Sequence, residues 1–271
     1  MNTLERSNEI RQLTLRCMAS IGQGHVGGSL SIADVLAVLY SKHMRIDPKN
    51  PKLEGRDRLV LSKGHAGPAL YATLASFGYF PKSELDTLNK LGTKLPSHCN
   101  MVLTTGVDMT AGSLGQGMSA AVGMAIGSVI KKDNATIYCI VGDGELQEGQ
   151  NWEAAMYAGN RHLGNLIVFV DNNKMQIDGM TSDISNIEDI VAKFKSFGFH
   201  TQRISGSNHQ AIDEAIIEAK KQLDKPSVIV MDTIKGAGVS FYEAMGSGNH
   251  NCAVTAQQLQ DATQELSKGA K

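Results

Sequence analysis

Two polar clusters in this sequence each follow an apolar run, and their residue types could bind a metal ion. Residues 136–141 run directly into Gly142-Asp143-Gly144, and the apolar residues 165–170 run into Asp171-Asn172-Asn173. If both runs are adjacent parallel strands, their carboxyl ends bring the two clusters to one edge of a sheet, where open α/β sheets bind ligands. The alternative is that the first cluster is a solvated acidic turn.

The expected donors are all oxygen atoms. The Asp143 carboxylate, an amide oxygen from the second cluster and a backbone carbonyl suit Mg²⁺ or Ca²⁺ better than zinc. Magnesium held by so few protein groups usually completes its coordination with phosphate oxygens and water. Gly142 and Gly144 have no side chains that would block a diphosphate, and a helix expected to start near Gln150 can offer backbone N–H groups to it.

The elements that must position these clusters follow a regular pattern from residue 119 onward. Helix-like and strand-like segments alternate, which indicates parallel strands joined by helical crossovers. The strands are apolar throughout, as expected when helices cover both faces of a sheet. The expected helices are 119–132, 151–162, 186–198 and 208–222, and the expected strands are 136–141, 165–170, 199–204 and 227–233. We therefore predict a doubly wound α/β fold with a mostly parallel sheet, as one domain over residues 1–271.

The N-terminal part is predicted to be helical. Apolar residues at helical spacing predict a helix over residues 3–20, and Ser31 with Asp34 resembles a capping box that starts a second helix. Gly22, Gly24 and Gly27 formally match a dinucleotide-binding fingerprint. That fingerprint must follow a strand and open a helix, whereas here a helix precedes it, so we do not predict a Rossmann site.

The composition limits the possible partners. Twenty-six basic and 27 acidic residues leave a net charge of -1, which gives no general field that would attract nucleic acid or an anionic membrane. The sequence has neither a signal peptide pattern nor an apolar run of about 18 residues. We expect a cytoplasmic protein that binds neither nucleic acid nor membrane.

Longer motifs around these clusters identify a family. In order, the chain contains "QGHVGGS", "LSKGHAGPALYA", "TAGSLGQGMSAAVGMA", "GDGELQEGQNWEAA", "LGNLIVFVDNNKMQIDG" and "DTIKGAGVSF". The Gly-Asp-Gly and Asn-Asn pair resembles the thiamine diphosphate motif, and the whole series resembles transketolases. The match extends over nearly the whole chain and is more specific than the two-part motif alone.

The resemblance implies a set of cofactor and metal contacts. Asp143, the Asn173 side chain and the Met175 carbonyl would bind Mg²⁺, for which Ca²⁺ or Mn²⁺ could substitute. Gly142 and Gly144 would lie against the diphosphate, and His65 would contact it. The remaining contacts would come from the backbone of Gly112 and Leu114, and from Ile177 near the thiazolium ring.

Three further histidines would act on the substrate. In transketolases the residues corresponding to His25, His98 and His250 line the substrate channel, where they would hydrogen-bond the donor sugar and its developing alkoxide. His250 departs from the family pattern, because Asn251 follows it where the family has Gly. The other four histidines, His43, His162, His200 and His209, are expected to have no catalytic role.

The resemblance also implies that the active site needs a second domain. Transketolases take the glutamate that activates the cofactor from a second, pyrimidine-binding domain, and this sequence ends at Lys271, about where that domain should begin. We therefore expect the N-terminal subunit of a split transketolase, in a heterotetramer with a C-terminal subunit. The pair would transfer a two-carbon ketol unit between sugars or sugar phosphates, and this chain would be inactive alone.

Two other functions stay open at this point. One is a subunit of another thiamine diphosphate enzyme, related to deoxyxylulose-phosphate synthase or to 2-oxoacid dehydrogenases. The other is a non-catalytic subunit that keeps the fold and binds a partner. Glu148 could reach a partner chain, or it could be a solvated acid at the start of a helix.

Overall fold

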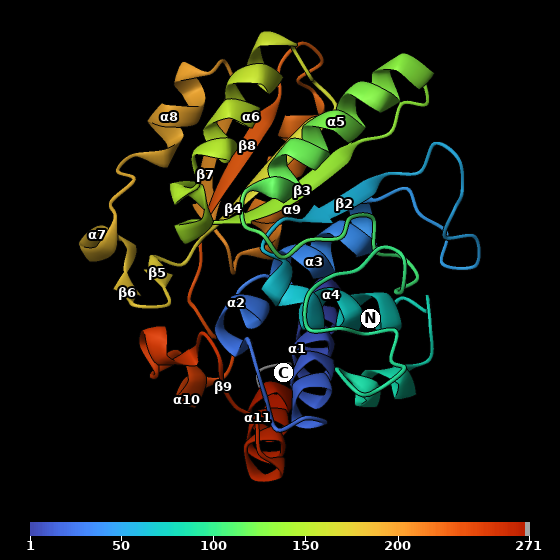
Figure 1. Ribbon diagram of the computed structural model, residues 1–271, viewed down its shortest axis with the longest axis vertical. Coiled ribbons are helices and arrows are strands. Elements are labelled where there is room, and N and C mark those ends of the chain that lie inside the picture. Colours follow the sequence, from blue (N-terminus) through green and yellow to red (C-terminus); the bar gives the residue numbers. More distant parts are fainter. Residues whose placement is uncertain (269–271) are drawn as a thin grey trace.

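A sheet of five parallel strands forms the centre of the computed structural model, which describes residues 1–268 (Figure 1). The strand order is β2-β3-β4-β8-β7, and each neighbouring pair is parallel. The strands are Arg58–Leu61 (β2), Ile137–Gly142 (β3), Leu166–Asn172 (β4), His200–Ser205 (β7) and Ser227–Asp232 (β8).

The central strands are apolar throughout because helices cover both of their faces. Successive side chains of a strand point to opposite faces, so Tyr138 and Ile140 pack into one apolar cluster while Ile137 and Cys139 pack into another. Every residue of β3 and β4 is buried. This double burial is the physical reason why these strands could be recognised from composition alone.

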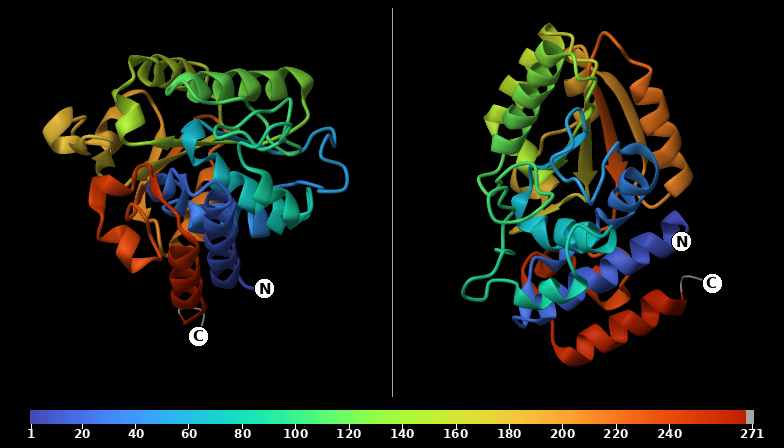
Figure 2. Two further views of the ribbon diagram at one scale, coloured as in Figure 1. Left: turned by 60° about the horizontal axis from the view of Figure 1, so that its bottom comes forward. Right: turned by 90° about the vertical axis from the view of Figure 1, so that its right-hand side faces the viewer.

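Helices form a layer on each side of the sheet (Figure 2). The prediction of a doubly wound α/β fold with a mostly parallel sheet is thereby confirmed. On one face lie Thr3–Ala19 (α1), Ala33–Val38 (α3), Gly67–Ser76 (α4) and His209–Lys220 (α9). On the other face lie Gln116–Lys131 (α5), Gly149–Asn160 (α6) and Ile190–Ser196 (α8).

Smaller elements complete the fold, most of them near the carboxyl edge of the sheet. Two short antiparallel pairs join Gln23–Gly24 (β1) to Cys252–Ala253 (β9) and Met175–Gln176 (β5) to Gly179–Met180 (β6). The β1–β9 pair joins segments from opposite ends of the chain. The other helices are Val26–Leu30 (α2), Thr181–Ile184 (α7), Ser240–Glu243 (α10) and Ala256–Lys268 (α11), with shorter helical turns at Leu39–His43, Gly64–Ala66, Lys82–Thr87, Gly144–Gln147 and Gly246–Asn249.

The predicted capping box at Ser31 is wrong. The chain is already helical at Val26–Leu30, and the N-cap of α3 is Ile32, which makes no side-chain capping bond. The Ser31 hydroxyl instead donates to Asp171, and the Asp34 carboxylate accepts two bonds from the Arg11 guanidinium. Both polar side chains therefore make tertiary contacts rather than local ones.

Strand β2 was not predicted, because its four residues are too few to show a pattern. This strand is important for the position of the segment Ser62–His65, into which it leads directly. The chain then leaves β2 toward α4 on one face of the sheet, whereas it leaves β3 toward α6 on the other face. Such a divergence opens a crevice at the carboxyl ends of the strands.

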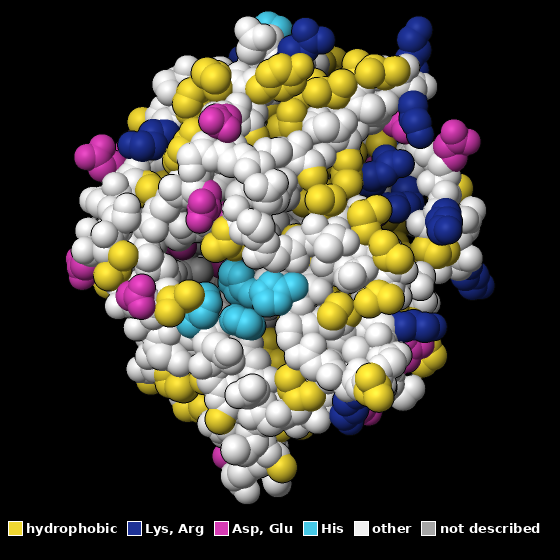
Figure 3. Space-filling model, in the orientation of Figure 1, with side chains coloured by type: hydrophobic (Ala, Val, Ile, Leu, Met, Phe, Trp, Pro, Cys, Tyr) yellow, Lys and Arg dark blue, Asp and Glu magenta, His cyan; other side chains and the backbone are white. Residues whose placement is uncertain are grey.

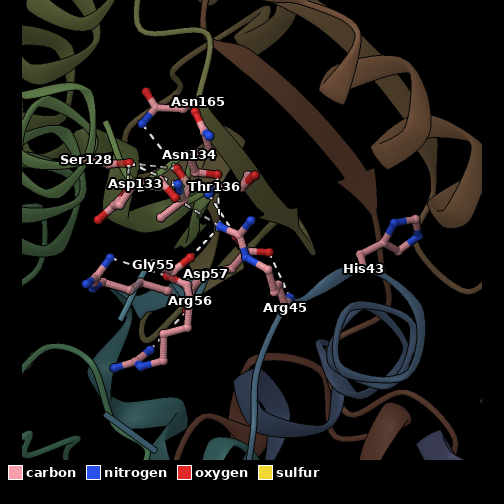
Figure 4. A network of polar contacts seen from close by, with 12 residues as sticks. His43, Arg45, Gly55, Arg56, Asp57, Ser128, Asp133, Asn134, Thr136 and Asn165 are labelled. Atoms are coloured by element: carbon pink, nitrogen blue, oxygen red, sulfur yellow. Dashed lines mark hydrogen bonds and ion pairs between the residues drawn. The ribbon is translucent and has the colours of Figure 1, made fainter. Parts of the chain in front are cut away.

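The opposite, amino edge of the sheet is held by a buried carboxylate, Asp57 (Figure 4). Asp57 accepts hydrogen bonds from the backbone N–H groups of Arg45 and Thr136, each at 2.9 Å. The Arg45 guanidinium in turn donates to the carbonyls of Gly55 and Asn134. This network joins the 45–57 loop to the start of β3 and so fixes where β2 begins. Within residues 1–268, no helix combines the length and apolar character that crossing a membrane requires.

Replacing Asp57 by Ala should destabilise the fold, because the partly buried backbone N–H groups of Arg45 and Thr136 lose their acceptor. We expect the free energy of unfolding to fall by about 2–4 kcal/mol, measured by urea denaturation. Glu54→Ala in the same loop is the control, since Glu54 is exposed and should change stability by less than about 0.5 kcal/mol. Equal effects of the two substitutions would contradict this role for Asp57.

Candidate functional site

A cavity of about 430 Å³ lies at the carboxyl ends of the parallel strands. Every residue that the sequence assigned to metal, cofactor or catalysis lines it: His25, His65, His98, Gly112, Leu114, Gly142, Asp143, Gly144, Asn173, Met175, Ile177 and His250. The four other histidines, His43, His162, His200 and His209, lie outside it. The cavity therefore collects residues from segments spread over most of the chain.

The two polar clusters meet as expected for adjacent strands. Gly142 of β3 is paired in register with Asp171 of β4, and the Asp143 backbone N–H donates to the Asp171 carbonyl at 3.2 Å. The Asp143 carboxylate accepts from the backbone N–H groups of Gly144, at 2.8 Å, and Lys174. Burial, together with the nearby Asp171 charge, raises the pKa of Asp143 to about 7. This carboxylate thus lies where a cation would stabilise its charge.

The Asn173 amide has a fixed orientation. Its Nδ2 donates to the Asp171 carboxylate at 2.9 Å, and its Oδ1 accepts from the Met175 backbone N–H at 3.1 Å. Asn172, by contrast, donates to Asp232 and does not line the cavity. Asn173, the residue directly after β4, therefore faces the site, whereas Asn172 does not.

The residues present fit a magnesium ion bound to a diphosphate. One carboxylate, one amide and one backbone carbonyl line the same wall, and each supplies oxygen, the donor that Mg²⁺ prefers. No group of three or more His, Cys, Asp or Glu residues suited to a metal occurs among residues 1–268. A Cβ at Gly144 would lie 3.1 Å from the Gln176 Cβ, so a side chain at this turn would be tightly packed and Gln176 would have to shift slightly.

Asp171 lies beneath this wall and is fully buried. It accepts hydrogen bonds from Ser31 at 2.7 Å, from the Lys63 ammonium at 2.6 Å and from Thr233, besides the bond from Asn173. Burial acts to raise the pKa of Asp171, but the Lys63 ammonium holds it below the ordinary value. The charged carboxylate therefore connects four separate segments of the chain.

Two buried lysines line the cavity and were not predicted from the sequence. Lys63 also donates to the Gly28 carbonyl at 2.6 Å. The Lys235 ammonium lies 3.4 Å from the Met175 carbonyl oxygen and 3.3 Å from Nδ1 of His250. Burial, with Lys63 nearby, lowers the pKa of Lys235 to about 8. An anionic ligand in this cavity would compensate both positive charges.

Four histidine rings gather at the mouth of the cavity, visible as one group in Figure 3. The ring centroid of His25 lies 5.3 Å from that of His65, 5.7 Å from that of His98 and 5.4 Å from that of His250. His65 and His250 are 5.1 Å apart. The rings come from the start of α2, the turn after β2, the loop before α5 and the loop after β8.

The environment of three of these rings, those of His25, His65 and His250, favours their neutral form. Burial, Lys235 and His25 lower the pKa of His250 to about 4. Burial, with Lys63 beside it, lowers the pKa of His65 well below its ordinary value, and burial and His98 lower that of His25. These rings can therefore hydrogen-bond sugar hydroxyls as neutral groups near pH 7.

The three acids of the stretch "GDGELQEG" have different environments. Asp143 faces the cavity, Glu145 is buried beneath it, and Glu148 is exposed at its rim. Sequence reasoning assigned Asp143 but left Glu145 and Glu148 open. The sequence contains only weak signals for the two lysines. Lys63 lies two residues before His65, and Lys235 lies shortly after β8.

A comparison with protein families matches residues 3–269 to the model described as the transketolase, thiamine diphosphate binding domain. The chain is 55% identical over 263 residues to the 6-deoxy-6-sulfo-D-fructose transketolase subunit SqwG of Clostridium sp. (strain MSTE9), covering 97% of this chain and 95% of that protein. It is 35% identical over 270 residues to one of the subunits of the apulose-4-phosphate transketolase of Phocaeicola vulgatus, covering 99% of this chain and 95% of that protein.

Solved structures give the same result. Transketolase from Leishmania mexicana superposes with a TM-score of 0.92 at 30% identity, and transketolase from Campylobacter jejuni with 0.90 at 33%. Each alignment covers 98% of this chain but only 41% and 43% of the solved chains. The chain thus spans less than half the length of these transketolases, while it spans nearly all of the two relatives named as subunits.

The histidine cluster should make the fold sensitive to acid. The pKa of His250 is about 4 in the folded chain, against an ordinary 6.5. Above pH 6.5 the ring is neutral in both the folded and the unfolded chain, so the stability that the folded chain has with a neutral His250 is fully present there. It is lost as the pH falls toward about 4, because the unfolded chain then binds protons that the folded chain does not. We expect the free energy of unfolding, measured by urea denaturation, to fall over this range.

The double variant His65→Gln, His250→Gln should show a shallower fall. Asp143 makes the free energy of unfolding change with pH in the opposite direction, since its pKa is raised in the folded chain. Wild type and variant both contain Asp143, so its effect cancels when the two are compared. His162→Gln is the control, because His162 is exposed outside the cavity. A double variant with the wild-type slope would contradict this account.

Proposed function

Since this chain belongs to the transketolase family as its thiamine diphosphate-binding domain, we propose that it is the N-terminal subunit of a two-chain transketolase. With a partner chain it transfers a two-carbon ketol unit from a ketose donor to an aldose acceptor. The observation that carries this proposal is the single cavity in which four histidines meet an oxygen-donor wall. Relatives named as transketolase subunits, matched over 95% of their length, support the two-chain arrangement.

The partner supplies the pyrimidine-binding domain and its activating glutamate. We propose that the two chains enclose thiamine diphosphate between them, in a heterotetramer that works in the cytoplasm. The exposed side chain of Ile177 at the cavity is consistent with a surface that the cofactor and partner cover. We also propose that residues 1–271 form one domain and that the pyrimidine-binding domain belongs to the partner chain.

The cofactor and its metal have defined places in the proposal. Asp143, Asn173 and the Met175 carbonyl bind Mg²⁺, with Ca²⁺ or Mn²⁺ as possible substitutes. Gly142 and Gly144 leave space for the diphosphate, and His65, together with Lys63 and Lys235, faces it. The backbone of Gly112 and Leu114 and the Ile177 side chain contact the rings. When bound, thiamine diphosphate supplies the electron sink for breaking and forming the carbon–carbon bond beside a carbonyl.

This chain's own catalytic groups are His25, His98 and His250. They hydrogen-bond the hydroxyls of the donor and stabilise charge that develops on its oxygen, His25 and His250 as neutral rings. Lys235 lies against His250 and orients that ring. Asn251, which replaces the family's Gly after His250, does not remove the ring from the cluster.

The donor is proposed to be a ketose with an anionic terminal group. The two relatives named as subunits carry the names of a sulfonated and a phosphorylated sugar, and the relative with 55% identity favours the sulfonate. The histidine cluster accounts for recognition of only one end of the donor ketose, the end that reacts. The terminal group is therefore assigned to the partner's side of the channel.

Reconstitution tests the proposed function. The chain alone should not transfer ketol units, whereas mixing it with the candidate partner chain, thiamine diphosphate and Mg²⁺ should restore transfer from 6-deoxy-6-sulfo-D-fructose or a ketose phosphate. Product formation is followed by mass spectrometry, and 2-oxoacid donors serve as the comparison. Robust turnover by this chain alone, or preference for a 2-oxoacid, would overturn the proposal. A complex that binds no cofactor would favour a non-catalytic subunit.

Two single substitutions should separate metal binding from chemistry. Asp143→Ala should abolish Mg²⁺-dependent cofactor binding, because the only carboxylate of the metal set is lost. His25→Ala should leave that binding largely intact and lower the rate of transfer by about 100-fold or more. Cofactor binding is measured by calorimetry on the complex, and His162→Ala is the control. Equal losses of cofactor affinity in both variants would contradict the division of roles.

A further inference from the structure

Glu145, the second acid of "GDGELQEG", holds three segments of the site together. Its side chain is 3% exposed. One carboxylate oxygen accepts from the Ser62 hydroxyl and from the Gly115 backbone N–H at 2.8 Å, and the other accepts from the Gly142 backbone N–H at 3.0 Å. The donors belong to the end of β2, the loop before α5 and the end of β3.

The loop of residues 111–117 lies directly on the end of β2. A Cβ at Gly117 would lie 2.5 Å from the Ser62 hydroxyl oxygen, and a Cβ at Gly64 would lie 2.3 Å from the Ala111 carbonyl oxygen. The glycines therefore let this segment approach Ser62 and the turn after β2 closely. Gly64 and Gly117 have no side chains to add to this contact, and the hydrogen bonds that Glu145 accepts from Ser62, Gly115 and Gly142 connect the segments directly.

We propose that Glu145 is a positioning residue that fixes the 111–117 loop against the Gly142–Gly144 turn. The backbone of Gly112 and Leu114 is thereby held in the same cavity wall as Asp143. The importance of this loop for the cofactor rests on the proposed function. The hydrogen-bonded connection itself rests only on the contacts of Glu145.

The three donors require a carboxylate. An ionised glutamate only accepts, and each of its two oxygens faces an N–H group here. In Glu145→Gln the amide nitrogen would face a backbone donor, so at least one N–H group would lose its acceptor while the side-chain size is kept. The Glu145 backbone is held separately, because the Asn151 amide donates to its carbonyl at 2.7 Å.

Hydrogen exchange on the full-length chain tests this proposal without any assay of activity. In Glu145→Gln, the amides of residues 111–117 and of Gly142 should exchange about tenfold faster or more than in wild type. Amides in the centre of β4 should be unchanged. The matched control is Glu214→Gln, which alters an exposed carboxylate on α9 that accepts only from Gln210.

Two results would overturn the proposal. One is unchanged exchange at residues 111–117 in a folded Glu145→Gln chain. The other is acceleration of equal size in β4, which would indicate a loss of overall stability alone. If Glu145→Gln does not fold, Glu145→Asp replaces it: the shorter carboxylate cannot reach both Gly115 and Gly142, so one of these amides should exchange faster. Wild-type exchange at both would also overturn the proposal.

A second readout uses the complex with the partner chain. Glu145→Gln should raise the half-saturating concentration of thiamine diphosphate about tenfold and change the rate at saturation much less, because the loop orders on binding. A lowered saturated rate with unchanged half-saturation would contradict positioning. If the complex proves to be inactive, the proposed function fails, but the exchange result still decides the role of Glu145.

Discussion

The site depends on one buried ion pair, between Lys63 and Asp171. Both side chains lie at the carboxyl edge of the sheet with almost no exposure to solvent. A buried pair is tolerated only when its remaining hydrogen-bonding capacity is also satisfied, and here Ser31, Thr233 and the Asn173 amide complete it. The pair therefore fixes α2, the turn after β2, the end of β4 and the loop after β8 relative to one another. Each of these segments carries, or adjoins, a group that lines the cavity.

Charges and neutral polar groups occupy different parts of the cavity. The lysines lie deep, beside Asp143 and Asp171, where an anion and its metal would be bound. The histidines lie at the mouth, and burial near the lysines lowers the pKa of His65 and His250, which favours their neutral form. Neutral rings suit the hydroxyl groups of a sugar, which need both donors and acceptors but little net charge. The positions of the lysines thus influence the chemistry of the histidines as well as that of the bound anion.

The sequence allowed prediction of those parts of the fold and site that local patterns determine. Strands β3 and β4 are continuous apolar runs, so their ends, with Asp143 and Asn173, could be placed at one sheet edge. Long-range contacts were out of reach. Ser31 and Asp34 have the spacing of a capping box, but partners 140 and 23 residues away bind them instead. Lys63 was missed because the four-residue strand before it has no recognisable period, and Glu145 because its three partners come from segments far apart or from the backbone.

The pairing of β1 with β9 has a consequence for the order in which the protein forms. His25 directly follows β1, and His250 lies two residues before β9, so this pairing of Gln23–Gly24 with Cys252–Ala253 brings the two rings together. A ribosome releases the first of these segments long before the second. The histidine group therefore cannot be complete in a nascent chain until residues 250–253 have emerged. A chain cut short before His250 would therefore lack one of the four rings at the cavity mouth.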